Sequence, residues 1–458
     1  MCMGKNNITN KNEVNMLEGS LLDKIILFAL PLAGSSILQQ LFNSCDTAVV
    51  GNFASSQDMA AVGANASVIC LIVSLFVGLS VGANVSIGRL IGHNERKRIN
   101  TAITTIMILA VLSGILLLVL GLILASPVLR LMKTPDDVLY LAIEYLQIYS
   151  LGMPFIMIYD FGAAILRSRG DSRRPFFALL FSGLVNVSLN LILVIVFKMG
   201  VAGVAIATVI SNAISSIFII IFLIKGDEDF RLNVHELKFD KEFFLEVLRI
   251  GVPSGIQGMI FSFSNSIIQT HLNGFNSTIM AGSTASQNIE TIGYYAINSF
   301  NQSATTFMSQ NYAAGKKDRC RKVFRYTLLC GLISCLIIDI LLLIFHGPVL
   351  SLFSGDSEVV KAAYIRMIHV ISFQCIASTY EISGSNLRGM GYSATPTILT
   401  IFGCVGFRLF WIYFIFPISK TYEMLLNVYP VSWCITGTLV MGAYFIISKK
   451  KLKVDVKI

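Results

Sequence analysis

The sequence predicts an all-α polytopic membrane protein with twelve transmembrane helices, arranged as two six-helix lobes that are related by a parallel internal repeat. Three observations support this prediction. Of the 458 residues, 55% are hydrophobic and 13% are charged, and the mean hydropathy is +0.73, whereas a soluble chain carries about a quarter charged residues. Apolar stretches of about 20 residues, the length that crosses a bilayer, recur along the whole chain. One short polar loop also occurs twice, half a chain apart.

The apolar stretches predict twelve spans, joined by short polar connections. Their ranges are 25–50, 66–88, 101–124, 139–163, 175–197, 201–224, 249–272, 284–307, 323–345, 362–384, 396–416 and 428–447. The longest charged connection, 225–248, falls near the middle of the chain and predicts a cytoplasmic linker between an N-terminal lobe at 25–224 and a C-terminal lobe at 249–447. A cytoplasmic segment at 1–24 and a basic cytoplasmic tail at 448–458 flank the two lobes.

The distribution of basic residues predicts the orientation. Most of the 35 Lys and Arg residues lie in alternate connections, and both ends of the chain belong to this basic set. The exceptions are Arg130, Lys133, Lys198, Lys361, Arg366, Arg408 and Lys420. Because basic residues accumulate in cytoplasmic loops, both termini are expected in the cytoplasm. The net charge of +9 is thereby explained by topology, and it does not indicate a nucleic-acid partner.

The repeated loop indicates a duplicated chain. "LRSRGDSRRP" at 166–175 and "LRGMGYSATP" at 387–396 share Leu, Arg, Gly, Ser and Pro at the same offsets. Gly170 and Gly391 suit a tight turn, and the final proline of each copy suits the start of a helix. Six helices per half bring both halves to the same side of the membrane at their first residue. The lobes are therefore expected to be related by an axis along the membrane normal, which is a transporter architecture.

The eighth span, "TASQNIETIGYYAINSFNQSATTF", is too polar for a hydropathy threshold, and only the repeat predicts that it crosses the membrane. Its polar side chains fall on one helical face. They are Gln287, Thr291, Tyr294, Asn298 and Gln302. Polar groups at membrane depth need a partner or water, so this face is expected to line a substrate cavity with Gln257, Glu290 and Gln374. The alternative is that 284–307 is a soluble loop outside the membrane.

Acidic side chains inside spans are candidates for function because burying a carboxylate is costly. Three polar residues are expected at the same membrane depth as Asp46, in the outer half of the N-terminal lobe. They are Asn186 and Asn190 in the fifth span and Thr208 in the sixth. A carboxylate with amide and hydroxyl oxygens can bind Na⁺, and the same carboxylate, when desolvated, can carry a proton. The alternative is a structural role, in which these groups join helices by hydrogen bonds.

Two further acids recur with the repeated loop. Asp160 and Glu381 each precede the Leu-Arg of a copy by six residues, close to Arg167 and Arg388. Ion pairs that close the cytoplasmic side are one interpretation, and ordinary salt bridges at helix ends are the other. Asp339 stands in an apolar stretch, and we expect either a local structural role or a lipid-facing position for it.

The sequence offers no support for an enzyme, a cofactor or a structural metal. The five histidines are scattered, and they show no paired-ligand spacing. No Walker loop occurs, so ATP is not the energy source. The nine cysteines contain no CxxC pair, and most of them fall inside apolar runs, where we expect small buried side chains.

Taken together, these motifs resemble the MATE (multidrug and toxic compound extrusion) transporters of the MOP superfamily. The resemblance rests on "NSCDTAVVGNF" at 43–53, "AAVGAN" at 60–65, the repeated loop, "NVSLN" at 186–190 and "QNYAAGKK" at 310–317. It covers nearly the whole chain and is specific as a set. It implies twelve helices in two lobes, cation-coupled alternating access, and export of amphipathic, often cationic, organic compounds.

The resemblance also implies roles for single residues. Asp46 matches the first-helix acid that the family uses for cation coupling, and Asn186 and Thr208 match other members of that site. Asn190 stands where several members have Asp, which leaves H⁺ and Na⁺ open as coupling ions. The seventh span has no acid in "GIQGMIFSFSN", although another branch of the family carries one there. Glu290 matches an eighth-helix acid of many relatives.

We therefore expect a monomeric, multi-pass antiporter of the bacterial cytoplasmic membrane that uses H⁺ or Na⁺ and needs no cofactor. Its partners would be the lipid bilayer and a small amphipathic substrate. A flippase for a lipid-linked substrate is the alternative on the same fold, and it would need a more basic cavity than the spans offer beyond Arg366 and Arg408. A membrane-embedded enzyme and a passive channel fit less well, because there is no nucleophile constellation and the halves are duplicated.

Overall fold

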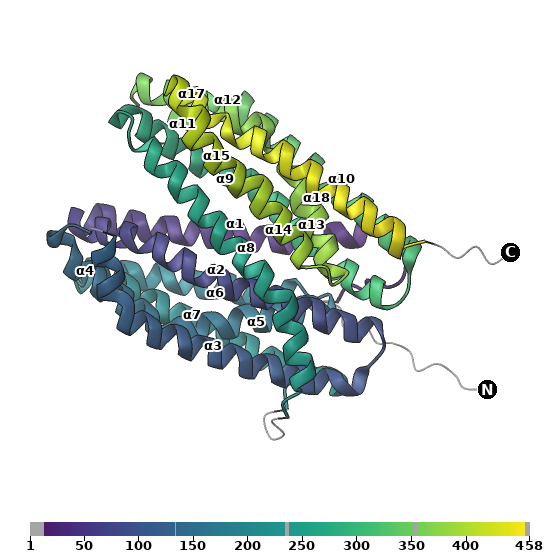
Figure 1. The fold of residues 1–458 in the computed structure, drawn as a ribbon. Helices are drawn as coiled ribbons and strands as arrows, with labels where there is room; N and C mark the ends of the chain where they lie inside the picture. Colours follow the sequence, from purple (N-terminus) through teal and green to yellow (C-terminus); the bar gives the residue numbers. More distant parts are fainter. Residues whose placement is uncertain (1–12, 133, 234–237, 352, 354, 454–458) are drawn as a thin grey trace, which may run out of the picture. The chain divides into compact units, whose positions relative to one another are not determined.

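The computed structural model describes residues 13–453, except for 133, 234–237, 352 and 354, and the described residues form helices and connections without a strand (Figure 1). The start of the predicted cytoplasmic segment at 1–12, the end of the basic tail at 454–458 and the linker residues 234–237 lie outside the described residues. The chain divides into two compact units. The first contains the described residues up to Val68 together with Ser86–Phe244, and the second contains Ile69–Val85 together with the chain from Leu245 onward.

The helices of the first unit follow the first six predicted spans. They are α1 (Leu22–Phe53), the two ends of α2 (Ser56–Gly92), α3 (Arg96–Leu131), α4 (Asp136–Leu151), α5 (Met153–Arg169), α6 (Arg173–Asn190), the π-helix η1 (Leu191–Val196), α7 (Gly200–Ile224) and the 3₁₀ turn η2 (Glu228–Phe230). The principal pairs are α3 with α5, α6 with α7 and α1 with α6. Asn65 joins α2 to α4, because its fully buried amide donates to the Ala142 carbonyl at 2.9 Å.

The helices of the second unit follow the last six spans. They are α8 (Lys241–Leu272), α9 (Ser277–Ala313), α10 (Lys317–Ile344), α11 (His346–Ser351), α12 (Ser357–Gln374), α13 (Ala377–Gly389), α14 (Ala394–Thr400), η3 (Ile401–Gly406), α15 (Phe407–Phe410), η4 (Trp411–Ile415), α16 (Phe416–Ser419), α17 (Tyr422–Leu426) and α18 (Val428–Lys451). Helix α9 is central to this unit and packs against α10, α12 and α13. The eleventh predicted span is therefore a series of short α and π segments.

Hydropathy alone finds fewer spans than the repeat predicts. Among the described residues, nine helices are long and apolar enough to cross a membrane, and two bent pairs raise the number to eleven. Helix α9 does not pass this test, as the sequence predicted, although its 37 residues are ample for a crossing. The polar side chains of α9 lower its mean hydropathy below the threshold of this test. With α9 included, the fold has twelve transmembrane helices in two lobes.

The two halves repeat each other in backbone detail. Helices α4 and α5 meet at a bend of 47°, and α12 and α13 meet at a bend of 41°. The predicted turn residues Gly170 and Gly391 both adopt left-handed conformations, with φ of 100° and 90°. The prolines that end the repeated loops fall in the first turn of α6 and α14. The duplicated loop of the sequence is thus a duplicated helix–turn–helix of the structure.

Helix α2 departs from the predicted division into lobes, because its central residues 69–85 belong to the second unit. The reason is a close crossing with α8. A Cβ on Gly78 would lie 2.1 Å from the backbone nitrogen of Gly255, so only glycine permits this approach. Further along α2, Asn84 accepts a hydrogen bond from Thr306 of α9 at 3.0 Å. Hydropathy gave no sign of this contact.

Candidate functional site

A carboxyl group of α1 lies among amide side chains of α6. Asp46 is half-buried and accepts a hydrogen bond from Nδ2 of Asn190. The same nitrogen lies 3.2 Å from Oδ1 of Asn186, one turn earlier on α6, and donates to it. Asn190 is fully buried and Asn186 is 4% exposed. Asp46 and Asn190, which the sequence placed at the same membrane depth, are therefore in direct contact between α1 and α6.

The atoms around Asp46 are mainly oxygens that can accept a cation. Thr208 on α7 interacts with the Asp46 carboxyl group, while its own hydroxyl proton is donated to the Val204 carbonyl at 3.0 Å. Oδ1 of Asn190 is buried and has no hydrogen-bond partner among the described residues. Within the described residues, no Lys or Arg forms an ion pair with Asp46. The cluster offers carboxylate, amide and hydroxyl oxygens without a resident positive charge.

The backbone changes its geometry directly beside this cluster. Helix α6 ends at Asn190, and the π-helix η1 continues from Leu191 to Val196. A π segment adds a residue to the helical turn, and such segments are found frequently at functional sites. The Asp46 cluster therefore lies where the fifth span changes its helical register.

The polar face of α9 is less buried than the rest of this helix. Gln287 is exposed, and the other four side chains that the sequence placed on this face are half-buried: Thr291, Tyr294, Asn298 and Gln302. The opposite side of α9 is buried, with Ile289 and Ile297 at 2% and 0% exposure. The hydroxyl of Thr291 donates to the Gln287 carbonyl of its own helix at 2.8 Å. The amphipathic pattern is real, and the substrate-lining role of this face stays a prediction.

Two residues that the sequence assigned to the same cavity are occupied inside the second unit. Both oxygens of the Glu290 carboxylate accept from Arg366 of α12, at 2.7 and 3.1 Å. Arg366 is 2% exposed and also donates to Ser283 of α9 at 3.0 Å. Nε2 of Gln374 donates to the Glu290 carbonyl at 2.8 Å. Glu290 and Gln374 therefore hold α9 against α12 in this structure.

A second buried arginine has no acidic partner among the described residues. Arg408 on α15 is 1% exposed and donates to Asn265 of α8 at 2.7 Å and to Ser432 of α18 at 3.2 Å. Its guanidinium carbon lies 4.9 Å from the ring centre of Tyr429, and that of Arg366 lies 5.3 Å from the same ring. The sequence analysis treated both arginines as exceptions to the charge pattern and as the few basic residues inside spans, without predicting their partners. An arginine inside a span requires partners, which was the available signal.

The inner end of the second unit carries a chain of hydrogen bonds. Asn301 of α9 donates to Glu381 at 2.9 Å and accepts from the Ser385 hydroxyl. Arg388 donates to Ser385 at 3.1 Å and to Oε1 of Gln257 at 2.8 Å. No direct ion pair joins Glu381 to Arg388 within the described residues. The two side chains are connected by hydrogen bonds through Asn301 and Ser385. Gln257, which was predicted to line the cavity, is 9% exposed and accepts the hydrogen bond from Arg388 at the end of this series.

The corresponding end of the first unit is fastened differently. In the described part of the chain no ion pair joins Asp160 to Arg167. Instead Arg169 binds Glu13 at 3.0 Å, and it also contacts Asp227. The Val14 amide donates to the Gly170 carbonyl at 3.1 Å. Burial raises the pKa of Glu13 more than the charge of Arg169 lowers it. Residues of the N-terminal segment and of the linker therefore bind the repeated loop.

The prediction of a lipid-facing position for Asp339 is wrong. Asp339 is 2% exposed and lies inside the second unit, on the side of α10 that packs against α9. The Cys335 thiol, one turn earlier, donates to its Oδ2 at 3.1 Å. The sequence could not reveal this orientation, because α10 is apolar on every side and has no clear polar face.

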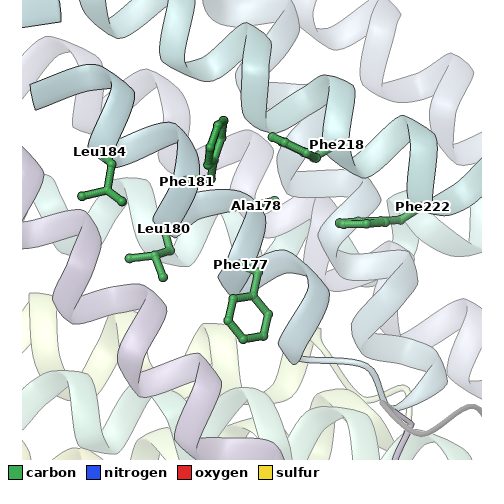
Figure 2. A pocket seen from close by; sticks show the side chains of 7 residues that line it. All are labelled: Phe177, Ala178, Leu180, Phe181, Leu184, Phe218 and Phe222. Atoms are coloured by element: carbon green, nitrogen blue, oxygen red, sulfur yellow. The ribbon is translucent and has the colours of Figure 1, made fainter. Parts of the chain in front are cut away.

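One pocket is lined entirely by apolar side chains. Figure 2 shows it between α6 and α7, with a volume of about 330 Å³. Its lining consists of Phe177, Ala178, Leu180, Phe181, Leu184, Phe218 and Phe222. Phe177 and Phe181 are 58% and 52% exposed, as expected for side chains that face lipid. This pocket offers no group that could bind a coupling ion.

Comparison with known proteins identifies the repeated unit. The sequence model of the MatE family matches twice, at residues 31–192 and 253–414. Among curated proteins, the chain is 27% identical to the probable multidrug resistance protein YoeA of Bacillus subtilis, over 93% of this chain and 94% of that protein. It is 22% identical to the multidrug export protein MepA of Staphylococcus aureus, over 82% of this chain and 83% of MepA.

Solved structures share the fold over nearly the full length. An outward-facing multidrug resistance MATE transporter of the MOP superfamily matches with a TM-score of 0.86 and 22% identity, over 97% of this chain and 98% of that chain. A MOP superfamily transporter from Pyrococcus furiosus, described by a reversed polarity of its binding pocket, matches with a TM-score of 0.88 and 21% identity, over 97% of this chain and all of that chain. These matches establish the fold of twelve helices in two lobes.

Proposed function

The chain belongs to the MatE family and is a multi-pass membrane transporter rather than an enzyme, and we propose that it is an H⁺- or Na⁺-coupled antiporter that exports small amphipathic, often cationic, organic compounds. Alternating access between two lobes would carry the substrate outward, with both termini in the cytoplasm of a bacterial cell and one chain as the working unit. The names of the curated relatives, multidrug resistance and multidrug export proteins, support this substrate class.

The observation that carries the proposal is the Asp46 cluster. A half-buried carboxyl group is hydrogen-bonded by a fully buried amide and has no basic partner among the described residues. Such a group favours an exchangeable positive charge, either a proton or Na⁺, since a buried charge without a partner is unstable. Binding of the ion from outside would favour the state that releases substrate outward. The membrane potential supplies about 2.3 kcal/mol per charge per 100 mV, which corresponds to roughly fifty-fold accumulation.

The substrate would be bound by the less buried face of α9. Gln287, Thr291, Asn298 and Gln302 offer amide and hydroxyl groups there, and Tyr294 offers an aromatic ring. A cationic aromatic compound can stack on such a ring and donate to the amide oxygens. The closed hydrogen-bond chains at Glu290 and Gln257 support a structural role for these two residues in the state described here.

A flippase for a lipid-linked substrate is not favoured. That function requires basic side chains that are free to hold a phosphate group. Arg366 is neutralised by Glu290, and Arg388 is engaged by Ser385 and Gln257. Arg408 has no acidic partner among the described residues, but it is 1% exposed and donates to Asn265 and Ser432.

Reconstitution into lipid vesicles tests the proposal. The purified protein would be given an imposed pH gradient, an imposed Na⁺ gradient or neither, while uptake of a fluorescent organic cation is followed. One of the two gradients should drive accumulation, and the response identifies the coupling ion. Protein-free vesicles and vesicles with a collapsed gradient are the controls. Equal transport under all three conditions would refute the antiport mechanism.

A further inference from the structure

Two buried oxygen atoms without hydrogen-bond partners border the same small space in the second unit. Asp339 on α10 is 2% exposed, and Gln374 at the end of α12 is 5% exposed. Neither Oδ1 of Asp339 nor Oε1 of Gln374 has a partner among the described residues. These atoms lie 2.7 and 3.0 Å from the position that a Cβ would take on Gly293 of α9. The missing side chain at Gly293 therefore leaves room in which the two oxygens approach each other.

The remaining polar atoms of both side chains are already occupied. Oδ2 of Asp339 accepts from the Cys335 thiol at 3.1 Å, which is a weak donor. Nε2 of Gln374 donates to the Glu290 carbonyl at 2.8 Å. This bond engages the amide nitrogen and leaves the amide oxygen at the space beside Gly293, which Oδ1 of Asp339 also borders. The neighbouring carboxylate of Glu290 is held on both oxygens by Arg366.

One proton would resolve this arrangement. An ionised Asp339 would present an acceptor to an acceptor in a buried place, and an unpaired buried charge costs several kcal/mol. A protonated carboxyl group has one O–H donor, and Oε1 of Gln374 is the unpaired acceptor that borders the same space. We propose that Asp339 is a second proton-binding site of this transporter, held as a neutral acid by Gln374 and separate from Asp46. Na⁺ would require more oxygen ligands than these two side chains supply.

The groups around Asp339 do not offer another neutralising partner. Helix α10 packs against α9, α11, α12 and α13, and the ionisable side chains nearest to Asp339 are the Cys335 and Cys375 thiols. Several charged or titratable groups on these helices have partners of their own. They include Glu290 with Arg366, Glu358 with Lys361, His369 with the Ile365 carbonyl, Glu381 with Asn301, Arg388 with Gln257, and His346, which stacks on Tyr364. The state of Asp339 is therefore set by its own proton.

A second proton site changes the expected stoichiometry of transport. If Asp339 and Asp46 both exchange a proton in each cycle, two protons would move for each substrate, and loss of one site would halve that ratio. This consequence rests on the proposed function and requires H⁺ as the coupling ion. The protonation of Asp339 itself does not depend on it, so the two statements can be tested separately.

Infrared spectroscopy of the full-length protein in lipid tests the protonation directly. At pH 7 the wild type should show the C=O stretch of a protonated carboxyl group, and this band should disappear in Asp339→Asn. Gln374→Leu should shift the band upward in frequency, because the hydrogen bond to the amide is lost. A spectrum of the wild type without a band that Asp339→Asn removes would overturn the proposal. Stoichiometric ²²Na⁺ binding that Asp339→Asn abolishes would also overturn it.

A steric variant and its control complete the test. Gly293→Ala places a methyl group between the two oxygens and should shift or abolish the band, whereas Gly442→Ala, which has open space around its Cβ position, should leave it unchanged. Asp46→Asn should keep the Asp339 band. If vesicles show no gradient-driven transport and the band is nevertheless lost in Asp339→Asn, the proposed function fails and the protonation of Asp339 stands. A Gly293→Ala spectrum identical to that of Gly442→Ala would contradict the assigned location.

Discussion

The two repeats place opposite kinds of polar group at matching points of the same helix pair. In the first repeat Asp46 of α1 meets Asn190 of α6, and each lies fifteen residues beyond the proline near the start of its helix. In the second repeat Asn265 of α8 meets Arg408, and each lies twelve residues beyond the corresponding proline. The contact has therefore moved by about one helical turn, and its acid has been replaced by a base.

This difference separates a site that can be filled from a site that is filled permanently. A carboxyl group accepts and releases a cation, whereas a guanidinium remains charged at any physiological pH. The other buried arginine of the second repeat, Arg366, forms an ion pair with Glu290. Duplication thus gave two copies of one helical scaffold. At this helix pair the first copy carries an acid, which we propose exchanges a cation, and the second copy carries a permanently charged base.

The largest effect on stability is expected from breaking the buried Glu290–Arg366 ion pair of the second repeat. Glu290→Gln leaves the guanidinium of Arg366 buried without its acid, and loss of one partner of a buried pair costs about 3–5 kcal/mol. We expect a large fall in the thermal unfolding temperature of the protein in detergent. The double variant Glu290→Gln with Arg366→Met should recover much of this loss, because no unpaired charge remains.

An exposed pair provides the control for that measurement. Glu358 and Lys361 also form a close ion pair, 2.6 Å apart, but their side chains are 63% and 70% exposed. Glu358→Gln should change the free energy of unfolding by about 0–1 kcal/mol. Equal losses for Glu290→Gln and Glu358→Gln would show that the Glu290 pair is not the fixed structural element that the comparison requires.

Removing the open acid of the first repeat should affect transport and spare the fold. Asp46→Asn keeps the size of the side chain and one acceptor oxygen, and removes its charge. Accumulation driven by 100 mV should fall by the roughly fifty-fold factor that one charge supplies, a loss of about 2.3 kcal/mol. The unfolding temperature should change little, since the buried carboxyl group has no ion pair to lose.

The matched variant for this experiment lies in the other repeat. Asn265→Asp introduces an acid beside Arg408, where it would form a permanent pair and no exchangeable site. The single variant should retain coupled transport, and combination with Asp46→Asn should not restore it. Restored coupling in the double variant would remove the distinction between the two repeats.

The sequence predicted the parts of this comparison that depend on position along the chain. Repeated loops, span lengths and the shared depth of Asp46 and Asn190 follow from spacing alone, and the backbone turns at Gly170 and Gly391 bear the repeat out. Even the polar α9 was placed in the membrane, because the duplication required a span there.

The sequence alone could not predict contacts between helices that are distant along the chain. Nothing in the apolar stretch around Asp339 indicates which side faces α9, and nothing near Arg366 specifies Glu290, 76 residues away, as its partner. The same limit applies to α2, whose close glycine crossing with α8 is visible only when both helices are in place. Helix packing, more than composition, decides which polar groups meet.

A moderate effect should come from the ring between the two arginines of the second repeat. Tyr429→Leu removes the aromatic face from Arg366 and Arg408, and each buried cation–π contact contributes about 0.5–2 kcal/mol. Tyr429→Phe keeps the ring and should behave as the wild type in thermal unfolding. A loss in the Phe variant as large as in the Leu variant would assign the effect to the hydroxyl and not to the ring.

The smallest effect concerns the contacts that hold the repeated turn in each repeat. In the first repeat the turn at Gly170 is held through the Glu13–Arg169 pair. In the second, the Ser393 hydroxyl donates to the Ile250 carbonyl at 2.6 Å and lies 3.0 Å from the Ser254 hydroxyl, without a titratable group in these contacts. Only the first fastening should therefore respond to pH.

Acidification is expected to tighten the first turn. Burial raises the pKa of Glu13 above its ordinary value of 4.5, so the docked segment takes up a proton at a higher pH than the free segment does. Docking should strengthen as the pH falls from 7 through the raised pKa toward 4.5, by less than about 1 kcal/mol. Hydrogen exchange of residues 13–18, corrected for intrinsic rates, measures this change, and Glu13→Gln should abolish it. Weaker protection in acid, or an equal response around Ser393, would mean that a buried carboxyl group does not distinguish the two turns.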